Sequence, residues 1–298
     1  MVKDVTLKGR FAPSPSGPLH FGSLTCALAS YADIKKRNGK WLVRIEDIDP
    51  PREMEGASSQ ILAQLAAHGL LWDEEVLYQS TRLNVYVEIL TSLAKRKLTY
   101  HCSCSRSRIR VLQGIYDEHC RERNLKSEGN ATRIIVQSDL GYISFTDQIC
   151  GPKKQKLSRS VGDFVIQRRD GLTSYQLAVA IDDNFQGITD IMRGSDLLDS
   201  THRQIFLQRC LGFPQPNYAH LPLAVTPDGI KLSKQNLASG LQAGKESKNL
   251  WEALNWLNQE PPVELKKMSP ADIIKWSVNH WDRTKLLLIP NQRAPIGY

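Results

Sequence analysis

The sequence predicts an α/β protein with a largely parallel sheet, an insertion in its middle and a small helical segment at its end. Near the N-terminus a β-rich run, a helix-like run and a second β-rich run follow one another, which is the order of a βαβ unit. The region from about 100 to 160 breaks this pattern with clustered cysteines and charges. The last stretch, from about Leu241, carries tryptophans and leucines at helical spacing.

The elements follow from local patterns. Residues 5–13, VTLKGRFAP, predict a short strand that ends at a proline-rich turn. Residues 22–37 have apolar side chains at helical spacing, and Asn38-Gly39 favours a helix end there. Residues 41–49, WLVRIEDID, predict the second strand. The same patterns predict helices in 53–70, 81–98 and 200–213, short strands in 132–138 and 141–147, and a strand, a turn and an apolar helix in 162–183.

The composition sets broad limits on function. Hydrophobic residues make up 41% of the chain and charged residues 23%, as is usual for globular proteins. The N-terminus has no signal-like apolar core and the chain has no run of about 18 apolar residues, so we expect a cytoplasmic protein without a membrane span. The net charge of +8 suits a polyanion such as RNA, although charge alone does not separate a nucleic-acid binder from a merely basic protein.

A proline- and glycine-rich turn, PSPSGPLHFGS, runs from Pro13 to Ser23 between the first strand and the first helix. Glycine and proline impose an unusual backbone path there. His20 lies where the helix begins, and a helix N-terminus offers free N–H groups to an anion. The segment is compatible with a phosphate site, but taken alone it is more typical of a plain turn with a surface histidine.

A second motif, GIKLSKQ, spans Gly229 to Gln235. Lys231 and Lys234 flank Ser233, and two ammonium groups with a hydroxyl can hold a polyphosphate and neutralise charge as it develops. Taken alone, the motif is equally consistent with a solvated basic loop.

Together these motifs resemble the HIGH and KMSKS signatures of class I aminoacyl-tRNA synthetases, in the form of the glutamyl branch. LVRIEDIDPPRE and the long segment from DGLTSYQLAVAIDD to FLQRCLG are similar to further glutamyl-family segments, so the likeness covers most of residues 5 to 240. The chain departs from the pattern at Ser23, where the second histidine of HIGH would stand, and at Gln235. The resemblance implies a Rossmann-like catalytic domain over 1–240, with the insertion at about 100–160, and a short helical, stem-contacting domain over 241–298.

The resemblance also implies a glutamate site. Arg10 matches the arginine that pairs with the side-chain carboxylate, which suits the two-pronged guanidinium. Glu46 matches the residue that holds the α-ammonium group. The remaining matches are the wall residues Ala12 and Ser14, and the pair Tyr175 and Arg193, which line the rest of the pocket. Without the family, a surface ion pair for Glu46 and a core tyrosine for Tyr175 would be preferred.

The implied reaction is adenylation, in which the glutamate α-carboxylate attacks the α-phosphate of ATP. His20 and Lys234 are the predicted catalytic contacts to the triphosphate, and neither has to act as a base, because a carboxylate carries no proton to remove. Mg²⁺ is expected to arrive with ATP. The predicted ATP-binding residues are His20, Gly22, Ser23, Lys231, Ser233 and Lys234.

Three of the six cysteines, Cys102, Cys104 and Cys120, lie close together in the sequence. Three thiolates suggest one structural Zn²⁺, which takes four ligands; the alternative is three reduced structural cysteines. His101, Tyr116 and His119 are candidates for the fourth ligand. The sequence resembles the glutamyl-branch pattern of these cysteines with a tyrosine, which favours Tyr116.

The chain ends soon after the lysine motif, where full glutamyl-tRNA synthetases continue into an anticodon-binding part. In this respect it most resembles the glutamyl-queuosine tRNA(Asp) synthetase family, which activates glutamate without tRNA and attaches it to queuosine in the anticodon loop. A monomer acting on queuosine-containing tRNA(Asp) is therefore expected. The alternatives are ordinary charging of tRNA(Glu), a non-catalytic zinc-containing RNA-binding paralogue, and a small-molecule nucleotidyltransferase.

Overall fold

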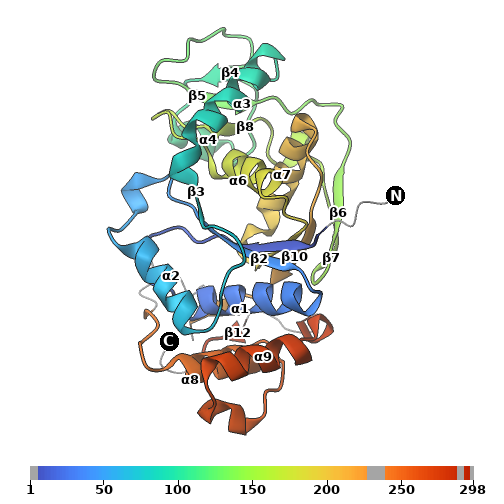
Figure 1. The fold of residues 1–298 in the computed structure, drawn as a ribbon. Coiled ribbons are helices and arrows are strands. Elements are labelled where there is room, and N and C mark those ends of the chain that lie inside the picture. Colours follow the sequence, from blue (N-terminus) through green and yellow to red (C-terminus); the bar gives the residue numbers. More distant parts are fainter. Residues whose placement is uncertain (1–5, 227–238, 287–291, 296–298) are drawn as a thin grey trace.

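The computed structural model describes residues 6–226, 239–286 and 292–295. Their centre is a seven-stranded sheet with the order β3-β2-β1-β9-β10-β6-β7 (Figure 1). All neighbouring strands in it are parallel except β6 and β7. The strands are β1 (Lys8–Phe11), β2 (Lys40–Ile45), β3 (Leu77–Tyr78), β6 (Ile143–Asp147), β7 (Gly151–Gln155), β9 (Asp190–Gly194) and β10 (Asn217–Leu221).

The strand order reverses at β1, because the next strand along the chain lies on one side of it and β9 lies on the other. In open parallel sheets, ligands bind beyond the carboxyl ends of the strands at such a switch point. The predicted βαβ unit is confirmed: α1 (Phe21–Lys36) connects β1 to its parallel neighbour β2.

Helices cover both faces of the sheet, and each face has its own hydrophobic cluster (Figure 1). In β2, Trp41, Val43 and Ile45 belong to the cluster of α1, whereas Leu42 belongs to the opposite one, as the alternation of side chains along a strand requires. The cluster of α1 also includes residues of α2 (Ala57–Ala67), α8 (Glu246–Trp256) and α9 (Pro270–His280), and the opposite cluster includes residues of α3 (Leu83–Lys95), α6 (Tyr175–Phe185) and α7 (Leu198–Leu211).

The expected insertion at 100–160 is divided between two sheets. β4 (Thr99–Cys102), β5 (Ala131–Ile134) and β8 (Phe164–Gln167) form a separate antiparallel sheet, accompanied by the short helices α4 (Arg106–Val111) and α5 (Leu157–Ser160). In contrast, β6 and β7 extend the main sheet, because β6 pairs with β10. The separate sheet therefore takes its strands from 99–134 and 164–167, whereas the strands between 143 and 155 belong to the main sheet.

The C-terminal helices share the core of the main body. Leu250, Leu254 and Trp281 belong to the same cluster as α1, and the Trp281 and Arg283 side chains donate hydrogen bonds to Asp33 of α1. Short helical turns at Val263–Lys267 and Arg283–Leu286 connect this region, and β12 (Gln292–Arg293) pairs with β11 (Ala224–Val225). Within the described residues, no helix is both long enough and apolar enough to cross a membrane.

Candidate active site and metal centre

A cavity of about 420 Å³ lies at the carboxyl ends of β1 and β9 and beside the start of α1. Every predicted site residue of this region that the structure describes lines it: Arg10, Ala12, Ser14, His20, Gly22, Ser23, Glu46, Tyr175 and Arg193. Lys231, Ser233 and Lys234 lie outside the described residues. Residues separated by more than 180 positions in the sequence thus meet in one cavity.

The proline- and glycine-rich turn forms the wall of this cavity next to α1. Its backbone is tied to neighbouring segments, because Pro13 and Pro15 accept hydrogen bonds from the backbone N–H groups of Glu46 and Met54. Gly17 has a φ of 127°, a conformation that L side chains rarely adopt. The prolines and glycines of this segment therefore shape a loop that is hydrogen-bonded to its neighbours at several points, and not a simple reversal of the chain.

His20 caps α1 as the sequence indicates. Its Nδ1 accepts the backbone N–H of Ser23 at 3.3 Å, so the neutral ring carries its proton on Nε2 and can donate it to an anion. Gly22 leaves room for the His20 ring, since a Cβ at position 22 would lie 3.2 Å from His20 Cε1.

The described segments on both sides of residues 227–238 border the same cavity. Leu223 and Ala224 line it on one side. On the other side, Gly240 forms an antiparallel bridge with His20, and the Leu241 N–H donates to the Leu19 carbonyl at 2.8 Å.

Arg10 and Glu46, which line the cavity, form a network of buried charged side chains with Asp183 and Arg44. Arg10 donates to both oxygens of Asp183, at 3.1 and 3.4 Å, and Arg44 donates to Asp183 at 2.8 Å. Arg44 also reaches Glu46 at 3.4 Å. Burial disfavours an ionised Asp183, but the Arg10 and Arg44 guanidiniums outweigh it and hold the pKa of this carboxyl below its usual range. In contrast, burial raises the pKa of Glu46 despite Arg44.

Arg44 and Asp183 were missed in the sequence, although a signal was present. Arg44 interrupts the apolar run of β2, and Asp183 follows the apolar segment AVAID in α6. A charged residue within a buried run needs a partner of opposite charge, and these two provide it for each other.

Arg193 lines the cavity from the end of β9. Its Nε–H donates to His220 at 3.1 Å and its Nη2 donates to Thr201 at 2.8 Å, whereas its buried Nη1 has no hydrogen-bond partner within the described part of the chain. Tyr175 lies nearby at the first turn of α6, and burial raises the pKa of its hydroxyl. An unpaired guanidinium N–H beside a cavity is suited to a carboxylate.

A second cavity of about 300 Å³ adjoins the first and shares Ser14, Ser16, Glu46 and Arg52 with it. Asp49 and Glu53 line its outer part. Glu46 therefore borders both cavities.

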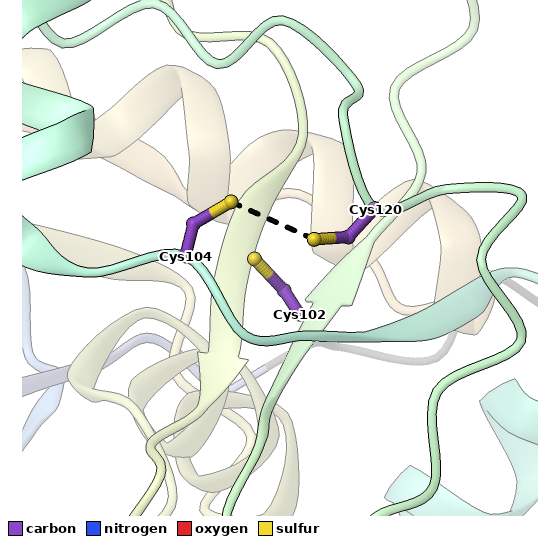
Figure 2. A group of neighbouring side chains, drawn as sticks. All are labelled: Cys102, Cys104 and Cys120. Atoms are coloured by element: carbon purple, nitrogen blue, oxygen red, sulfur yellow. Dashed lines mark hydrogen bonds between the residues drawn. The ribbon is translucent and has the colours of Figure 1, made fainter.

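The three clustered cysteines converge as the sequence predicts. The sulfurs of Cys102, Cys104 and Cys120 all lie within 4.8 Å of one another and point toward a common centre (Figure 2). Tetrahedral Zn–S bonds of about 2.3 Å place sulfurs about 3.8 Å apart, which agrees with this spacing. The donor set therefore fits a metal ion.

Tyr116 is buried beside the cysteine cluster. Its hydroxyl oxygen is 3.4 Å from Cys102 Sγ and 3.6 Å from Cys104 Sγ. Burial opposes ionisation of the Cys120 thiol, but hydrogen bonds involving Tyr116 and Ser103 outweigh it and lower its pKa to about 6. The other two candidates for a fourth ligand, His101 and His119, contact Thr132 and Arg123 instead.

Comparison with known proteins covers almost the whole chain. The family model for the catalytic domain of class I tRNA synthetases (E and Q) matches residues 6–254. A curated protein of Pseudomonas aeruginosa named glutamyl-Q tRNA(Asp) synthetase is 50% identical over 278 residues, which are 93% of this chain and 94% of the relative. A protein of the same name from Ectopseudomonas mendocina is 48% identical over 286 residues, 96% of each chain.

Solved structures show the same fold at lower identity. The glutamate-tRNA synthetase of Elizabethkingia anophelis has a TM-score of 0.79 at 23% identity, over 96% of this chain and 68% of that one. A glutamate tRNA ligase from Elizabethkingia meningosepticum, in complex with its amino acid, has a TM-score of 0.76 at 24% identity, over 96% and 67% of the two chains.

Proposed function

The chain belongs to the class I tRNA synthetase family specific for glutamate and glutamine, and from this premise we propose that it activates L-glutamate with ATP and transfers it to queuosine in the anticodon loop of tRNA(Asp). The first step rests on the cavity that buried Arg10 and Glu46 line together with residues at the N-terminus of α1. A guanidinium and a carboxylate there suit the two charges of an amino acid, and a helix N-terminus suits a phosphate.

The residues then have distinct roles. Arg10 pairs with the glutamate side-chain carboxylate, and Glu46 holds the α-ammonium group. Tyr175 and Arg193 complete the amino-acid pocket, whose wall includes Ala12 and Ser14. A glutamine side chain carries no negative charge, so it would lose the charge-assisted hydrogen bond that a carboxylate makes with Arg10, which supports specificity for glutamate.

ATP occupies the part of the cavity beside α1. His20 Nε2 donates to the triphosphate, and Gly22 and Ser23 let the phosphates approach the helix N-terminus. Lys231, Ser233 and Lys234 are proposed to contact the same phosphates. The reaction needs no general base, because the attacking carboxylate is already ionised, so the chain acts by positioning and by stabilising charge. Mg²⁺ would accompany ATP and neutralise its phosphates.

The metal centre is proposed to hold one structural Zn²⁺. Cys102, Cys104 and Cys120 would bind it through thiolates, and Tyr116 would supply the fourth ligand through its hydroxyl oxygen. The ion would stabilise the loops next to the separate sheet and takes no part in adenylation. Metal analysis of protein purified without chelator tests this; a zinc-to-protein ratio near zero would exclude it.

The acceptor is inferred from the named relatives. Proteins at about half identity over nearly the whole chain are named for Q and tRNA(Asp). Sequence-specific RNA recognition mostly targets unpaired bases in loops, and the second cavity offers space for one beside Glu46. A tRNA substrate agrees with the net charge of +8, and we expect a monomer in the cytoplasm. We propose that segment 241–298 contacts the tRNA.

Two measurements, made one after the other, test the two steps of the proposal. Glutamate-dependent ATP–pyrophosphate exchange without tRNA is expected, with glutamine and aspartate inactive; its absence would favour a non-catalytic RNA-binding protein. Transfer is then compared on tRNA from cells with and without queuosine. Equal acceptance of glutamate by both preparations would reject queuosine as the acceptor and favour ordinary charging of tRNA(Glu).

A further inference from the structure

A buried row of three side chains leads away from the amino-acid pocket, across the carboxyl ends of three neighbouring strands. Arg193 of β9 pairs in register with His220 of β10, and Asp147 ends the next strand, β6. Arg193 is 5% exposed, His220 is fully buried and Asp147 is 2% exposed. The Arg193 Nε–H donates to His220 Nε2 at 3.1 Å, and His220 Nδ1 lies 2.6 Å from Asp147 Oδ2.

The hydrogen bonds of Asp147 determine where the His220 proton resides. Asp147 Oδ1 accepts three backbone N–H groups, from Ile149 at 3.0 Å, Cys150 at 2.7 Å and His220 at 3.2 Å. Its Oδ2 is therefore the oxygen that accepts a hydrogen bond from His220 Nδ1–H. In the neutral ring this leaves a lone pair on Nε2, which is what the Arg193 Nε–H requires.

We propose that His220 and Asp147 are positioning residues that orient Arg193 so that its Nη1 faces a carboxylate oxygen of the bound glutamate. His220 and Thr201 hold two nitrogens of the guanidinium, and only Nη1 is left without a partner within the described residues. A buried donor without a partner destabilises a protein, whereas an anionic acceptor in the adjoining cavity would satisfy it. This inference rests on the proposed glutamate site.

The substitution Asp147→Asn tests the role of the proton. The three backbone donors require the amide oxygen at the Oδ1 position, so the NH2 group replaces Oδ2 and donates to His220 Nδ1. The ring proton must then reside on Nε2, where it opposes the Arg193 Nε–H. We expect the KM for glutamate in ATP–pyrophosphate exchange to rise roughly 10- to 100-fold, while the KM for ATP changes less than about twofold.

Nitrogen-15 NMR of histidine-labelled protein reads the tautomer without any catalysis. The His220 proton is expected on Nδ1 in the wild type and on Nε2 in Asp147→Asn. An unchanged glutamate KM in a folded Asp147→Asn protein would overturn the inference, and so would a wild-type ring protonated on Nε2. A purely structural role would lower thermal stability without the selective change in glutamate KM.

If Asp147→Asn does not fold, two substitutions at position 220 test the orientation of Arg193 instead. His220→Gln retains an oxygen that can accept the Arg193 Nε–H, whereas His220→Leu removes every acceptor. A glutamate KM close to wild type for Gln and raised for Leu supports the inference; equal values for both overturn it. No exchange by the wild-type protein would instead reject the proposed function, and this inference with it.

Discussion

The ion pairs of Arg10 and Arg44 with Asp183 determine how Arg10 can act at the proposed amino-acid site. Because Asp183 holds two of its nitrogens, the guanidinium is fixed before any ligand arrives. Pre-organisation of this kind lowers the cost of binding. Arg44 is fully buried and binds Asp183 as well, so that the aspartate faces two cations.

The substitution Arg10→Lys keeps the positive charge but removes the planar guanidinium, whose several N–H groups can contact two carboxylates at once. One ammonium group cannot contact Asp183 and a glutamate carboxylate in the planar geometry of a guanidinium. We expect the KM for glutamate to rise by about tenfold or more in the exchange assay, from the loss of a charge-assisted hydrogen bond. Arg96→Lys, at an exposed arginine that does not line the cavity, serves as control. A wild-type KM in Arg10→Lys would contradict the assignment.

Glu46 gives the amino-acid site a predicted pH dependence. Burial raises the pKa of its carboxyl above the ordinary value of 4.5, and only the ionised form attracts an ammonium group. As the pH falls through the raised pKa, the ionised fraction falls and the glutamate KM should rise. Glu46→Gln should have a KM roughly 10- to 100-fold higher with this dependence removed. Exchange kinetics at a series of pH values measure both, and a KM that is independent of pH in the wild type would refute the role of Glu46.

The cavity-lining residues Arg10, His20 and Glu46 are indicated by motifs that resemble the glutamyl family, whereas no such motif indicates the residues that support them. Arg10, His20 and Glu46 lie in short motifs whose spacing is local. In contrast, the hydrogen-bonded residues Arg10 and Asp183 are 173 positions apart in the sequence, and Asp147 and His220 are 73 positions apart. Such pairs arise only when the sheet assembles, so local patterns do not reveal them.

The loop that carries Tyr116 depends on Gly162, which lies two residues before β8 begins. Gly162 has a φ of +66°, and a Cβ there would lie 2.4 Å from the Tyr116 carbonyl oxygen. The Tyr116 N–H also donates to the Val161 carbonyl at 3.0 Å. The close approach of two backbones thus places the tyrosine against the cysteines.

Replacing Gly162 with alanine should therefore weaken metal binding. The methyl group would displace the Tyr116 backbone and with it the hydroxyl that lies beside Cys102 and Cys104. We expect zinc to be lost at a lower chelator concentration than from the wild type. Gly129→Ala is the control, because Gly129 also has a positive φ, +64°, but has open space around its Cα. It should cost about 1–2 kcal/mol of stability and leave zinc retention unchanged; equal zinc retention in the two variants would contradict the role of Gly162.

At the level of elements, helices were easier to predict than sheet membership. The sequence predicts the first helix from residue 22, and the helix begins at Phe21. The prediction is close because the prolines and glycines before the helix and the lysines of its last turn are local signals. The strand predicted in 141–147 exists as β6, but its partner β10 begins 70 residues after β6 ends, at Asn217. Its place in the main sheet therefore depends on a contact that the local sequence does not contain.

Across the whole molecule, three buried histidines link protonation to folding. His68, His202 and His220 are each at most 5% exposed. Burial is the largest cause that lowers each of their pKa values below the ordinary 6.5. His68 follows α2, His202 lies in α7 and His220 lies in β10. Each of the two hydrophobic clusters therefore has at least one buried histidine in or next to its elements. His68 and His220 have hydrogen-bond partners, but both ring nitrogens of His202 have none within the described residues.

The sign of the pH effect follows from these lowered values. As the pH falls below 6.5, the unfolded chain binds protons that the folded chain does not, so stability is fully present above 6.5 and is lost toward the folded pKa values. His202→Leu removes one such site without breaking a hydrogen bond within the described residues. Relative to wild type, the variant should gain up to about 1.4 kcal/mol between pH 7.5 and pH 5.5, since 5.5 lies one pH unit below the unfolded pKa. Urea unfolding of both proteins at the two pH values measures this gain. Effects common to both proteins, including loss of metal in acid, cancel in the difference. A difference in stability that stays constant with pH would mean that folding does not lower the pKa of His202.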